Sequence, residues 1–418
     1  TQSYCSMTAK EYKQFKEIEI RLGLFDYEID GVHIWERVRF QVKSKIDRAM
    51  GIGQAHTSLK VSLSYRARQL SLLISNIFNR NSFLAEKADL LFYGHERRVK
   101  LDDHKWWDIY CDPISSNINC SYVQIEDDYL KSHRSPSKTN NLYYLDAANY
   151  LGSIERFLGF GDISLSKNDL RWIKSLEDEF NQAFYVLVNV KEIIERYLSK
   201  RKSKLKYYRY IINRVNPQAA ILVVSYGKET FIEACKKQGV PTIELQHGTI
   251  NSRHPGYDFP NGVKKHSFPD HLLVWGDHWE QQANYPISAQ NIISVGYPYL
   301  DMQKARLKTD REKKGVVFIS QGTIGHDLSK LAVELVSVAS EDIPVTYKLH
   351  PGEYDRWKKE YPWLLESEVK VIDESGPGLH EVLSTCEWQV GVNSTAIYEG
   401  IAFGAKTLLF TGTKADPL

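Results

Sequence analysis

Residues 219–248, AAILVVSYGKETFIEACKKQGVPTIELQHG, hold the pattern that decides the fold. Two short apolar runs, AAILVV and PTIEL, flank a segment with helical spacing, KETFIEACKKQG. A short apolar run, a helix and a second apolar run are typical of a βαβ unit, in which a helix joins two parallel strands. We therefore predict a mostly parallel α/β sheet around this stretch.

The same alternation continues on both sides of this stretch. Strand-like runs begin upstream at Ala88 with ADLLFYG, WWDIYCDPI, SYVQIED and LYYLD, and HLLVWG and IISVG follow downstream. The pattern dissolves between Tyr297 and Lys314 and then resumes with GVVFIS, VTYKLH, VKVID, WQVGV and TLLF. We predict two Rossmann-like α/β domains that face each other across a cleft, with an N-terminal helical addition. The expected boundaries are 1–85, 86–303 and 304–418.

Length and composition agree with this division. The 418 residues exceed the roughly 250 to 300 at which one hydrophobic core stops growing. The net charge, 54 − 52 = +2, is too small to indicate a nucleic-acid binder. The five cysteines form no C-x-x-C pair, so we expect neither a zinc site nor a disulfide framework, and we expect the reducing cytoplasm. The chain opens without Met and stops soon after TLLF, so we expect one or both ends to be trimmed.

Two stretches of the sequence are basic, and the sequence leaves open what each of them contacts. Residues 59–80 interleave apolar and basic side chains, which suits either an anionic membrane surface or an ordinary surface helix. Residues 199–214, SKRKSKLKYYRYIINR, suit an exposed helix, a contact with lipid headgroups or a nucleic acid. We expect no nucleic-acid partner. No apolar run approaches the ~20 residues that span a bilayer, so membrane contact is expected to be peripheral.

The loop after PTIEL carries the first candidate catalytic residue, His247. A histidine at a strand end can remove a proton from an acceptor hydroxyl, and Gly248 lets a substrate approach the backbone. A buried structural histidine is the alternative. Glu96, after the strand-like ADLLFYG, is a second candidate base, although a solvated charge run explains it equally well.

Three further loops are candidate sites for a nucleotide phosphate. Ser320, Gln321, Gly322 and Thr323 follow GVVFI and precede a helix, where amides and hydroxyls can form an anion nest. A turn that needs Gly and Ser for its conformation alone is the alternative.

His350 and Pro351 follow VTYKL, and a histidine there can donate to a phosphate oxygen. Ser394 and Thr395 are expected at the N-cap and in the first turn of a helix, with Glu399 near the same face and suited to ribose hydroxyls. The alternatives are a structural histidine and a plain N-cap with an unrelated glutamate.

Residues 219–410 resemble the GT-B glycosyltransferases of surface-polysaccharide synthesis. The loop from Gln246 to Thr249, the His350-Pro351 pair and the segment from Ser394 to Glu399 are similar to motifs of CDP-glycerol glycerophosphotransferases, bacterial sialyltransferases and capsule Kdo-transferases. VGYPYLD and NSTAIYEGIAFG are also similar to segments of the non-hydrolysing UDP-sugar 2-epimerases.

The resemblance implies a nucleotide-sugar donor whose phosphate binds His350, Ser394 and Thr395, and catalysis by His247. The acidic pair followed by Gly that supplies the sialyltransferase base is not evident, because Glu126-Asp127-Asp128 continues with Tyr. The base therefore stays open between His247 and a carboxylate.

We expect a glycosyltransferase that needs no metal and no cofactor, acting on a glycan or lipid-linked acceptor in the cytoplasm or at the inner face of the membrane. The alternatives are CDP-glycerol-type phosphotransfer, a UDP-sugar epimerase and a binding scaffold without catalysis.

Overall fold

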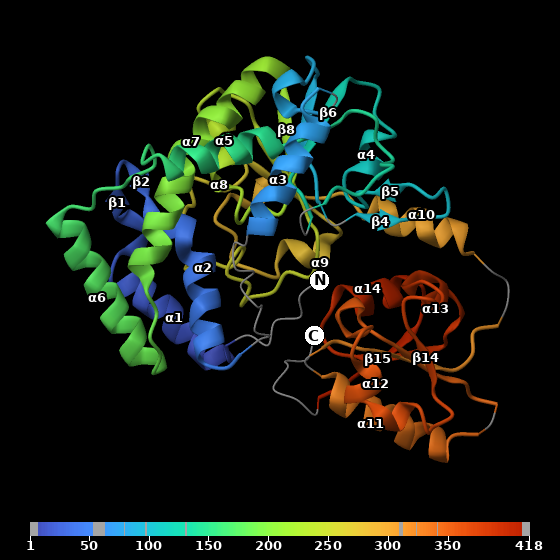
Figure 1. The fold of residues 1–418 in the computed structure, drawn as a ribbon. Coiled ribbons are helices and arrows are strands. Elements are labelled where there is room, and N and C mark those ends of the chain that lie inside the picture. Colours follow the sequence, from blue (N-terminus) through green and yellow to red (C-terminus); the bar gives the residue numbers. More distant parts are fainter. Residues whose placement is uncertain are drawn as a thin grey trace. The chain divides into compact units, whose positions relative to one another are not determined.

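The computed structural model describes residues 7–52, 63–78, 80–96, 98–129, 132–308, 312–322, 324–340 and 342–411 (Figure 1). The chain divides into two compact units: an N-terminal unit built from Ala9–Gly51 and Ala55–Pro298, and a C-terminal unit built mainly from Tyr299–Leu418. Each unit holds a large sheet in which all neighbouring strands are parallel. The predicted pair of Rossmann-like α/β units is thereby confirmed, whereas the cleft between them and the domain boundaries stay predictions.

The sheet of the N-terminal unit has seven strands in the order β11-β10-β9-β8-β3-β6-β7. The strands are β3 (Leu90–Tyr93), β6 (Tyr122–Glu126), β7 (Leu142–Tyr144), β8 (Ala219–Val223), β9 (Thr242–Leu245), β10 (His271–Val274) and β11 (Ile292–Ser294). From β3 the chain first adds β6 and β7 on one side and later adds β8 to β11 on the other. The strand order therefore reverses between β3 and β8, and ligands of open parallel sheets bind at such a switch point.

Apolar side chains cover both faces of this sheet. In β8, Ala220 and Leu222 pack into one hydrophobic cluster, whereas Ile221 and Val223 pack into another on the opposite face. Alternate residues of a strand point to opposite faces, so a strand covered on both sides must be apolar throughout. This is why AAILVV reads as a continuous apolar run.

The sheet of the C-terminal unit has five strands in the order β14-β13-β12-β15-β16. The strands are β12 (Val316–Ile319), β13 (Val345–Lys348), β14 (Lys370–Ile372), β15 (Trp388–Gly391) and β16 (Lys406–Leu409). Helices α11 (Gly325–Val338), α12 (Trp357–Glu360), α13 (Leu379–Thr385) and α14 (Thr395–Ala402) surround it. Here the order reverses between β12 and β15, which makes their carboxyl ends the switch point.

Helices and two small hairpins complete the N-terminal unit. The predicted helical addition is present ahead of β3 as α1 (Ala9–Arg21), α2 (Ile34–Ala49) and α3 (Leu63–Asn76). The later helices are α4 (Asp112–Ser115), α5 (Asp146–Phe157), α6 (Lys167–Phe184), α7 (Val190–Val215), α8 (Glu229–Lys236) and α9 (Asp277–Glu280). Helix α10 (Pro298–Arg306) follows, and all of it after Pro298 belongs to the C-terminal unit. The hairpins pair β1 (Glu28–Ile29) with β2 (Val32–His33) and β4 (Val99–Lys100) with β5 (Trp106–Trp107).

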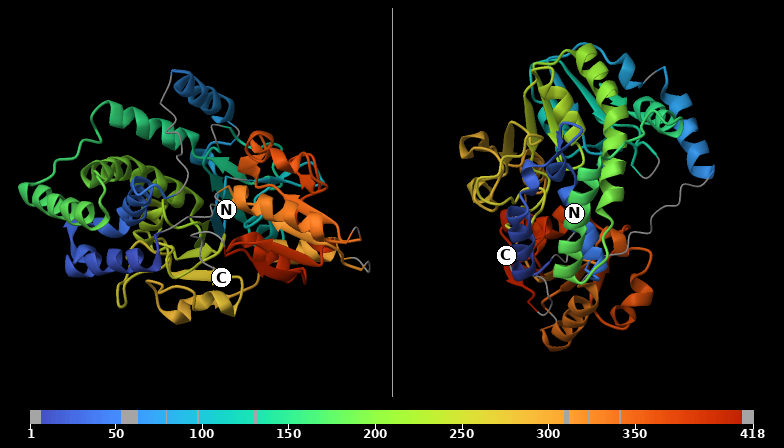
Figure 2. Two further views of the ribbon diagram at one scale, coloured as in Figure 1. Left: turned by 90° about the horizontal axis from the view of Figure 1, so that it is seen from below. Right: turned by 90° about the vertical axis from the view of Figure 1, so that its left-hand side faces the viewer.

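Helix α7, with 26 residues, packs against α2, α5, α6 and α8 (Figures 1 and 2). Its start is fixed by Asn189, whose side chain accepts from the amide of Glu192, and it ends at Asn216, whose φ of 51° is left-handed. Within the described part of the chain, no helix combines the length and the apolar character needed to cross a membrane.

One predicted strand is wrong. The run WWDIYCDPI forms only the two-residue β5, followed by a turn and the short helix α4. Asp108 causes the turn, because its Oδ1 accepts from the amides of Tyr110 and Cys111 at 3.0 and 3.1 Å. Such local bonds from an aspartate offer the backbone an alternative to pairing in a sheet.

Candidate functional site

A half-buried lysine marks the switch point of the N-terminal unit. The ammonium of Lys228 donates to the carbonyl of Val223, at the end of β8, at 2.7 Å and to that of Gly94, just after β3, at 3.3 Å. It also lies 4.1 Å from the ring centroid of Tyr93. Burial lowers the pKa of Lys228, and the carboxylate of Glu96 opposes that shift. The lysine therefore places a positive charge where a parallel sheet offers its ligand site.

The backbone after β8 adopts an unusual conformation. Val224 has φ of 65°, a left-handed value that is a genuine outlier for a β-branched residue. This turn brings the amide of Ser225 to 2.9 Å from Oε1 of Glu244, and Tyr226 follows directly. Backbone strain of this kind costs about 1 to 3 kcal/mol and clusters at functional sites.

His247, in the loop after β9, lies between two tyrosines. Its Nε2 is 3.0 Å from the hydroxyl of Tyr226, and its Nδ1 is 3.2 Å from the hydroxyl of Tyr257. Tyr257 gives its own proton to Glu244 at 2.6 Å, so it accepts the proton of Nδ1. Nε2 is therefore the basic nitrogen of His247.

The surroundings keep His247 neutral. Burial lowers its pKa well below 6.5, and His95, His254 and Lys228 act in the same direction. The hydroxyl of Tyr110 also donates to the carbonyl of His247 at 2.8 Å, which fixes the loop. A neutral imidazole with a defined tautomer has the form that a general base needs.

The carboxylates near this site have different surroundings. Glu96 is half-buried in the loop after β3, on the side of Lys228, whereas its neighbour Arg97 lies outside the described residues. Glu126 is buried against Arg98 at 2.8 Å, and burial raises its pKa to about 7. Asp127 accepts from the hydroxyl of Tyr93 at 2.5 Å. Glu126 and Asp127 therefore take part in hydrogen bonds within the N-terminal unit.

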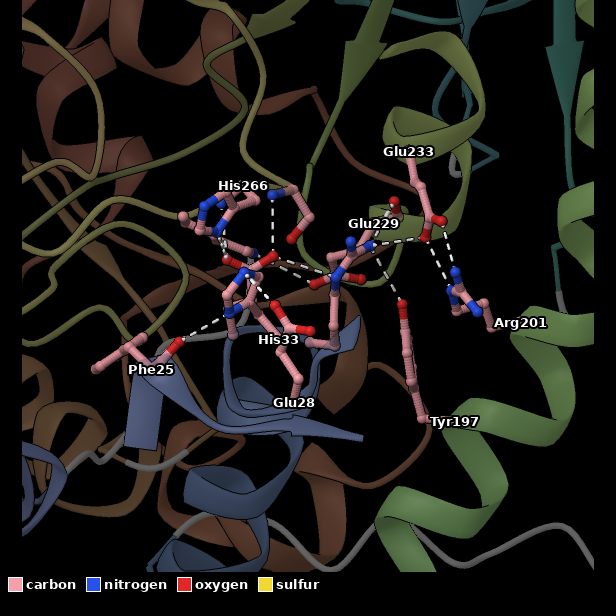
Figure 3. A network of polar contacts seen from close by, with 12 residues as sticks. Phe25, Glu28, His33, Tyr197, Arg201, Glu229, Glu233 and His266 are labelled. Carbon is pink, nitrogen blue, oxygen red and sulfur yellow. Dashed lines mark hydrogen bonds and ion pairs between the residues drawn. The ribbon is translucent and has the colours of Figure 1, made fainter. Parts of the chain in front are cut away.

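A buried network of charged side chains holds the loop between β8 and α8 (Figure 3). Arg37 of α2 donates to the carbonyl of Glu229 at 3.0 Å, and its Nη1 lies 3.5 Å from Oε2 of Glu233. Arg201 of α7 binds Glu233 through two hydrogen bonds, at 2.9 and 2.6 Å, and Glu36 lies 3.2 Å from Arg37. Helices α2 and α7 therefore fix the start of α8 and the loop that leads into it.

The half-buried His254 is expected to make the N-terminal unit lose stability in acid. Burial, followed by Lys43, lowers the pKa of His254 from 6.5 to about 3. Between these values the unfolded chain binds a proton that the folded chain does not, so the free energy of unfolding falls as the pH falls. We expect His254 to account for a loss of about 1 to 2 kcal/mol near pH 5. Urea unfolding of wild type and His254→Gln at neutral pH and near pH 5 measures this loss, with the exposed His278→Gln as control. An equally steep pH dependence in His254→Gln would contradict the assignment.

In the C-terminal unit a buried glutamate joins two strand ends. Glu353 accepts from the hydroxyl of Ser320, after β12, at 3.0 Å and from the hydroxyl of Tyr361 at 2.7 Å. Its other oxygen accepts from the amide of His350, after β13, at 2.8 Å. Glu353 is 0% exposed and Ser320 is 2% exposed. The hydroxyl of Ser320 is thus bound to this carboxylate and to the hydroxyl of Tyr347, 2.9 Å away.

His350 lies at the start of a short 3-10 helix, Pro351–Glu353. Its Nδ1 accepts from the amide of Gly352 at 3.1 Å. Because Nδ1 is an acceptor, a neutral His350 carries its proton on Nε2. Its donation to a phosphate oxygen stays a prediction.

Four polar side chains next to the switch point of the C-terminal unit have a buried atom without a hydrogen-bond partner. These atoms are Oε1 of Gln321, Oδ1 of Asn393, Oγ of Ser394 and Oγ1 of Thr395. Gln321 follows β12, and the other three precede or begin α14 after β15. Buried polar atoms are normally paired, so a group of unpaired ones at one place indicates a ligand site.

Helix α14 is held close to the sheet. Gln389 of β15 donates to the carbonyl of Ile397 at 2.8 Å, and a Cβ on Gly400 would lie only 1.9 Å from Oε1 of Gln389. Ser394 is the N-cap of α14, as predicted, although its hydroxyl caps no amide. On the same helix, Glu399 is paired with His380 at 3.2 Å.

The structure brings most of the predicted donor-site residues into one unit. Ser320, Gln321 and Gly322 follow β12, the His350-Pro351 pair follows β13, and the segment from Ser394 to Glu399 follows β15, while Thr323 lies outside the described residues. These three strands are neighbours in the sheet. His247 and Glu96 belong to the N-terminal unit.

Sequence reasoning missed five polar residues of these sites: Tyr226, Lys228, Glu244, Tyr257 and Glu353. The position of Tyr226 and Lys228 directly after AAILVV is the signal that points to them. Glu353 follows two residues after Pro351, and in such a loop a buried acceptor is hard to distinguish from a surface glutamate. Among the residues that the structure describes, no three His, Cys, Asp or Glu side chains form a group that could hold a metal ion.

The fold and the two switch points define a class, a two-unit α/β protein with polar sites at the ends of parallel strands. No protein-family model matches the chain, and no curated protein matches it. Among solved structures, it is similar to UDP-GlcNAc 2-epimerase from Methanocaldococcus jannaschii, with TM-score 0.43, 9% identity and coverage of 78% of this chain and 84% of that one. UDP-GlcNAc 2-epimerase from Neisseria meningitidis, bound to UDP-GlcNAc, gives TM-score 0.40, 10% identity and coverage of 78% and 82%. The wall teichoic acid polymerase TagF gives TM-score 0.36, 10% identity and coverage of 97% and 80%. Likeness at this level assigns no activity, so the function must be argued from the residues.

Proposed function

We propose that the chain is a glycosyltransferase that moves a sugar or sugar-like group from a nucleotide-activated donor to a hydroxyl of a glycan or lipid-linked glycan. The observation that carries the proposal is the group of four unpaired buried polar atoms next to the switch point of the C-terminal unit. Hydroxyl and amide oxygens beside the N-terminus of α14 suit a nucleotide diphosphate, because helix amides and the helix dipole favour an anion there. Glu399 suits the ribose hydroxyls.

Each unit has its own role in the proposed transfer. In the C-terminal unit, Ser394, Thr395 and Nε2–H of His350 bind the departing nucleotide phosphate and stabilise its growing charge. In the N-terminal unit, Nε2 of His247 receives the proton of the acceptor hydroxyl, and Glu96 is the alternative base. The acceptor oxygen forms a bond to the anomeric carbon of the donor while the bond from that carbon to the nucleotide phosphate breaks.

The same residues also suit a CDP-glycerol-type phosphotransfer, in which the acceptor attacks phosphorus. An epimerase would convert a UDP-sugar without a second substrate. Analysis of the products therefore separates epimerisation from transfer to an acceptor. We expect the reaction to proceed without metal in the cytoplasm; loss of activity on chelation, restored by Mn²⁺, would overturn that expectation.

Thermal unfolding with a panel of CMP-, CDP-, UDP- and GDP-sugars tests the proposal first, because a nucleotide that binds the folded state raises the melting temperature. No shift with any nucleotide would contradict it.

Thr395→Val is expected to stabilise the free protein and weaken nucleotide binding. The substitution removes a buried hydroxyl that has no partner, so the free energy of unfolding should rise by about 0.5 to 1 kcal/mol. The dissociation constant of the nucleotide should rise about tenfold, since a hydrogen bond to a charged phosphate is lost. Thr385→Val is the matched control, because that hydroxyl already donates to the carbonyl of Val382 at 3.1 Å. Lower stability with unchanged binding would show that Thr395 is structural.

A further inference from the structure

The end of α5 and the loop after it expose large apolar side chains. Phe157, Leu158 and Phe160 are 80%, 61% and 67% exposed, and Leu151 and Ile154, earlier on the helix, are 40% and 39% exposed. The buried face of α5 consists instead of small residues, Ala147, Ala148 and Gly152. We call the five exposed side chains the apolar tip. A contiguous exposed patch of this kind marks an interaction site.

Helix α3 adds to this surface. It packs against α5, and the side chain of Asn76 near its end donates to Asp146 at the start of α5 at 3.3 Å (Figure 1). Leu70 and Ile74 of α3 and Phe78 just beyond it are 41%, 63% and 84% exposed. Two adjoining helices therefore present apolar side chains to the outside.

The loop of the apolar tip lies directly on the basic part of α7. Arg156 donates from Nη1 to the hydroxyl of Ser203 at 2.9 Å, and a Cβ on Gly161 would lie 2.7 Å from Oγ of Ser199. From Arg196 to Arg214 the sequence contains eight Lys and Arg residues and no Asp or Glu. The apolar side chains thus adjoin a helix surface of one charge.

Only part of this positive charge is neutralised by neighbouring carboxylates. Arg196 pairs with Glu192, Arg201 with Glu233 and Lys206 with Glu155, and Asp127 acts on Lys204. Lys200, Lys202 and Arg209 are exposed and have no ion pair among the described residues. The exposed cations beside the apolar tip are therefore available to an anionic partner.

We propose that the apolar tip and the exposed cations of α7 together dock the protein on an anionic lipid bilayer. Phe157, Leu158 and Phe160 enter the boundary between headgroups and acyl chains, and Lys200 and Lys202 contact the lipid phosphates. A bilayer matches both halves of the surface at once, whereas an acidic protein or a nucleic acid would use the cations and leave much of the apolar tip in water. The proposal does not depend on the reaction that the protein catalyses.

Co-sedimentation of the full chain with lipid vesicles tests this docking surface. We expect binding to vesicles that mix phosphatidylcholine with phosphatidylglycerol, weaker binding to phosphatidylcholine alone, and release as salt screens the charges. Phe157→Ser combined with Phe160→Ser should weaken binding at least about tenfold, because the apolar contribution is lost. Lys200→Glu combined with Lys202→Glu should also weaken it about tenfold and abolish the preference for the anionic vesicles.

Matched controls lie on the same unit. Tyr185→Ser combined with Leu187→Ser removes apolar side chains that are 96% and 91% exposed elsewhere, and Lys10→Glu combined with Lys167→Glu reverses charges elsewhere. Both controls should bind vesicles like wild type. Circular dichroism and thermal unfolding show whether each variant is folded.

Three outcomes would overturn the proposal. The first is no binding of wild type to the anionic vesicles. The second is equal binding by the folded tip variants. The third is that wild type binds no vesicles but instead binds a single-stranded RNA, or forms a dimer in light scattering, and that the tip variants lose this RNA binding or this dimer.

Discussion

His247→Ala is expected to lower the rate of transfer by about 10²- to 10⁴-fold, the usual contribution of a general base. The physical reason is that Nε2 of His247 is the basic nitrogen of a neutral imidazole, whose tautomer is set by Tyr257 and Glu244. Nucleotide binding should be unchanged, because the proposed nucleotide residues belong to the other unit. Initial rates with donor and acceptor, together with the nucleotide-induced shift in melting temperature, measure the two effects separately.

The pH profile and a neighbouring variant sharpen this test. Burial lowers the pKa of His247 well below 6.5, so the rate should show no inflection from this group between about pH 6 and 8. Tyr226→Phe removes the hydroxyl that lies 3.0 Å from Nε2. The rate should fall if the acceptor proton passes to His247 through that hydroxyl, and it should be kept if Nε2 removes the proton directly. His278→Ala, on an exposed histidine of the same unit, is the control. A folded His247→Ala enzyme with nearly full activity would leave His247 a structural role and make Glu96 the base to test.

Glu353→Ala is expected to destabilise the C-terminal unit by about 3 kcal/mol or more. The substitution leaves the hydroxyls of Ser320 and Tyr361 and the amide of His350 without their acceptor, in a place where Glu353 is 0% exposed. Buried donors that lose a charged acceptor pay their full desolvation cost. Hydrogen exchange of the amides of β12 and β13 reports on this unit alone and should show much faster exchange.

The same variant should lose nucleotide binding, because Glu353 ties together the loops after β12 and β13. Glu353→Gln keeps one acceptor oxygen, so it should lie between Glu353→Ala and wild type in both measurements. Glu360→Ala removes an exposed carboxylate that is bonded to Arg356, and it should change stability by no more than about 0.5 kcal/mol. Wild-type exchange rates in Glu353→Ala would show that the three donors find other acceptors.

The sequence predicted the parallel sheets because strands covered on both faces are continuously apolar, as in AAILVV and GVVFI. It placed His350 and Ser394 correctly at strand ends for the same reason. It did not predict the ammonium of Lys228 between the ends of β3 and β8, because that position depends on a pairing between strands far apart in the chain. Nor did apolar content reveal that Asp108 would turn the chain after Trp107.

The position of β3 also has a consequence for how the chain folds during synthesis. β3 pairs with β6 on one side, a strand close in sequence, but on the other side it pairs with β8, which leaves the ribosome only after α5, α6 and α7. Until β8 arrives, one edge of an apolar strand stays open, and such edges recruit other chains. Pairings between distant strands also form slowly, because the loop between them must close first. Completion of the N-terminal sheet is therefore expected to be the slow, aggregation-exposed step of biosynthesis.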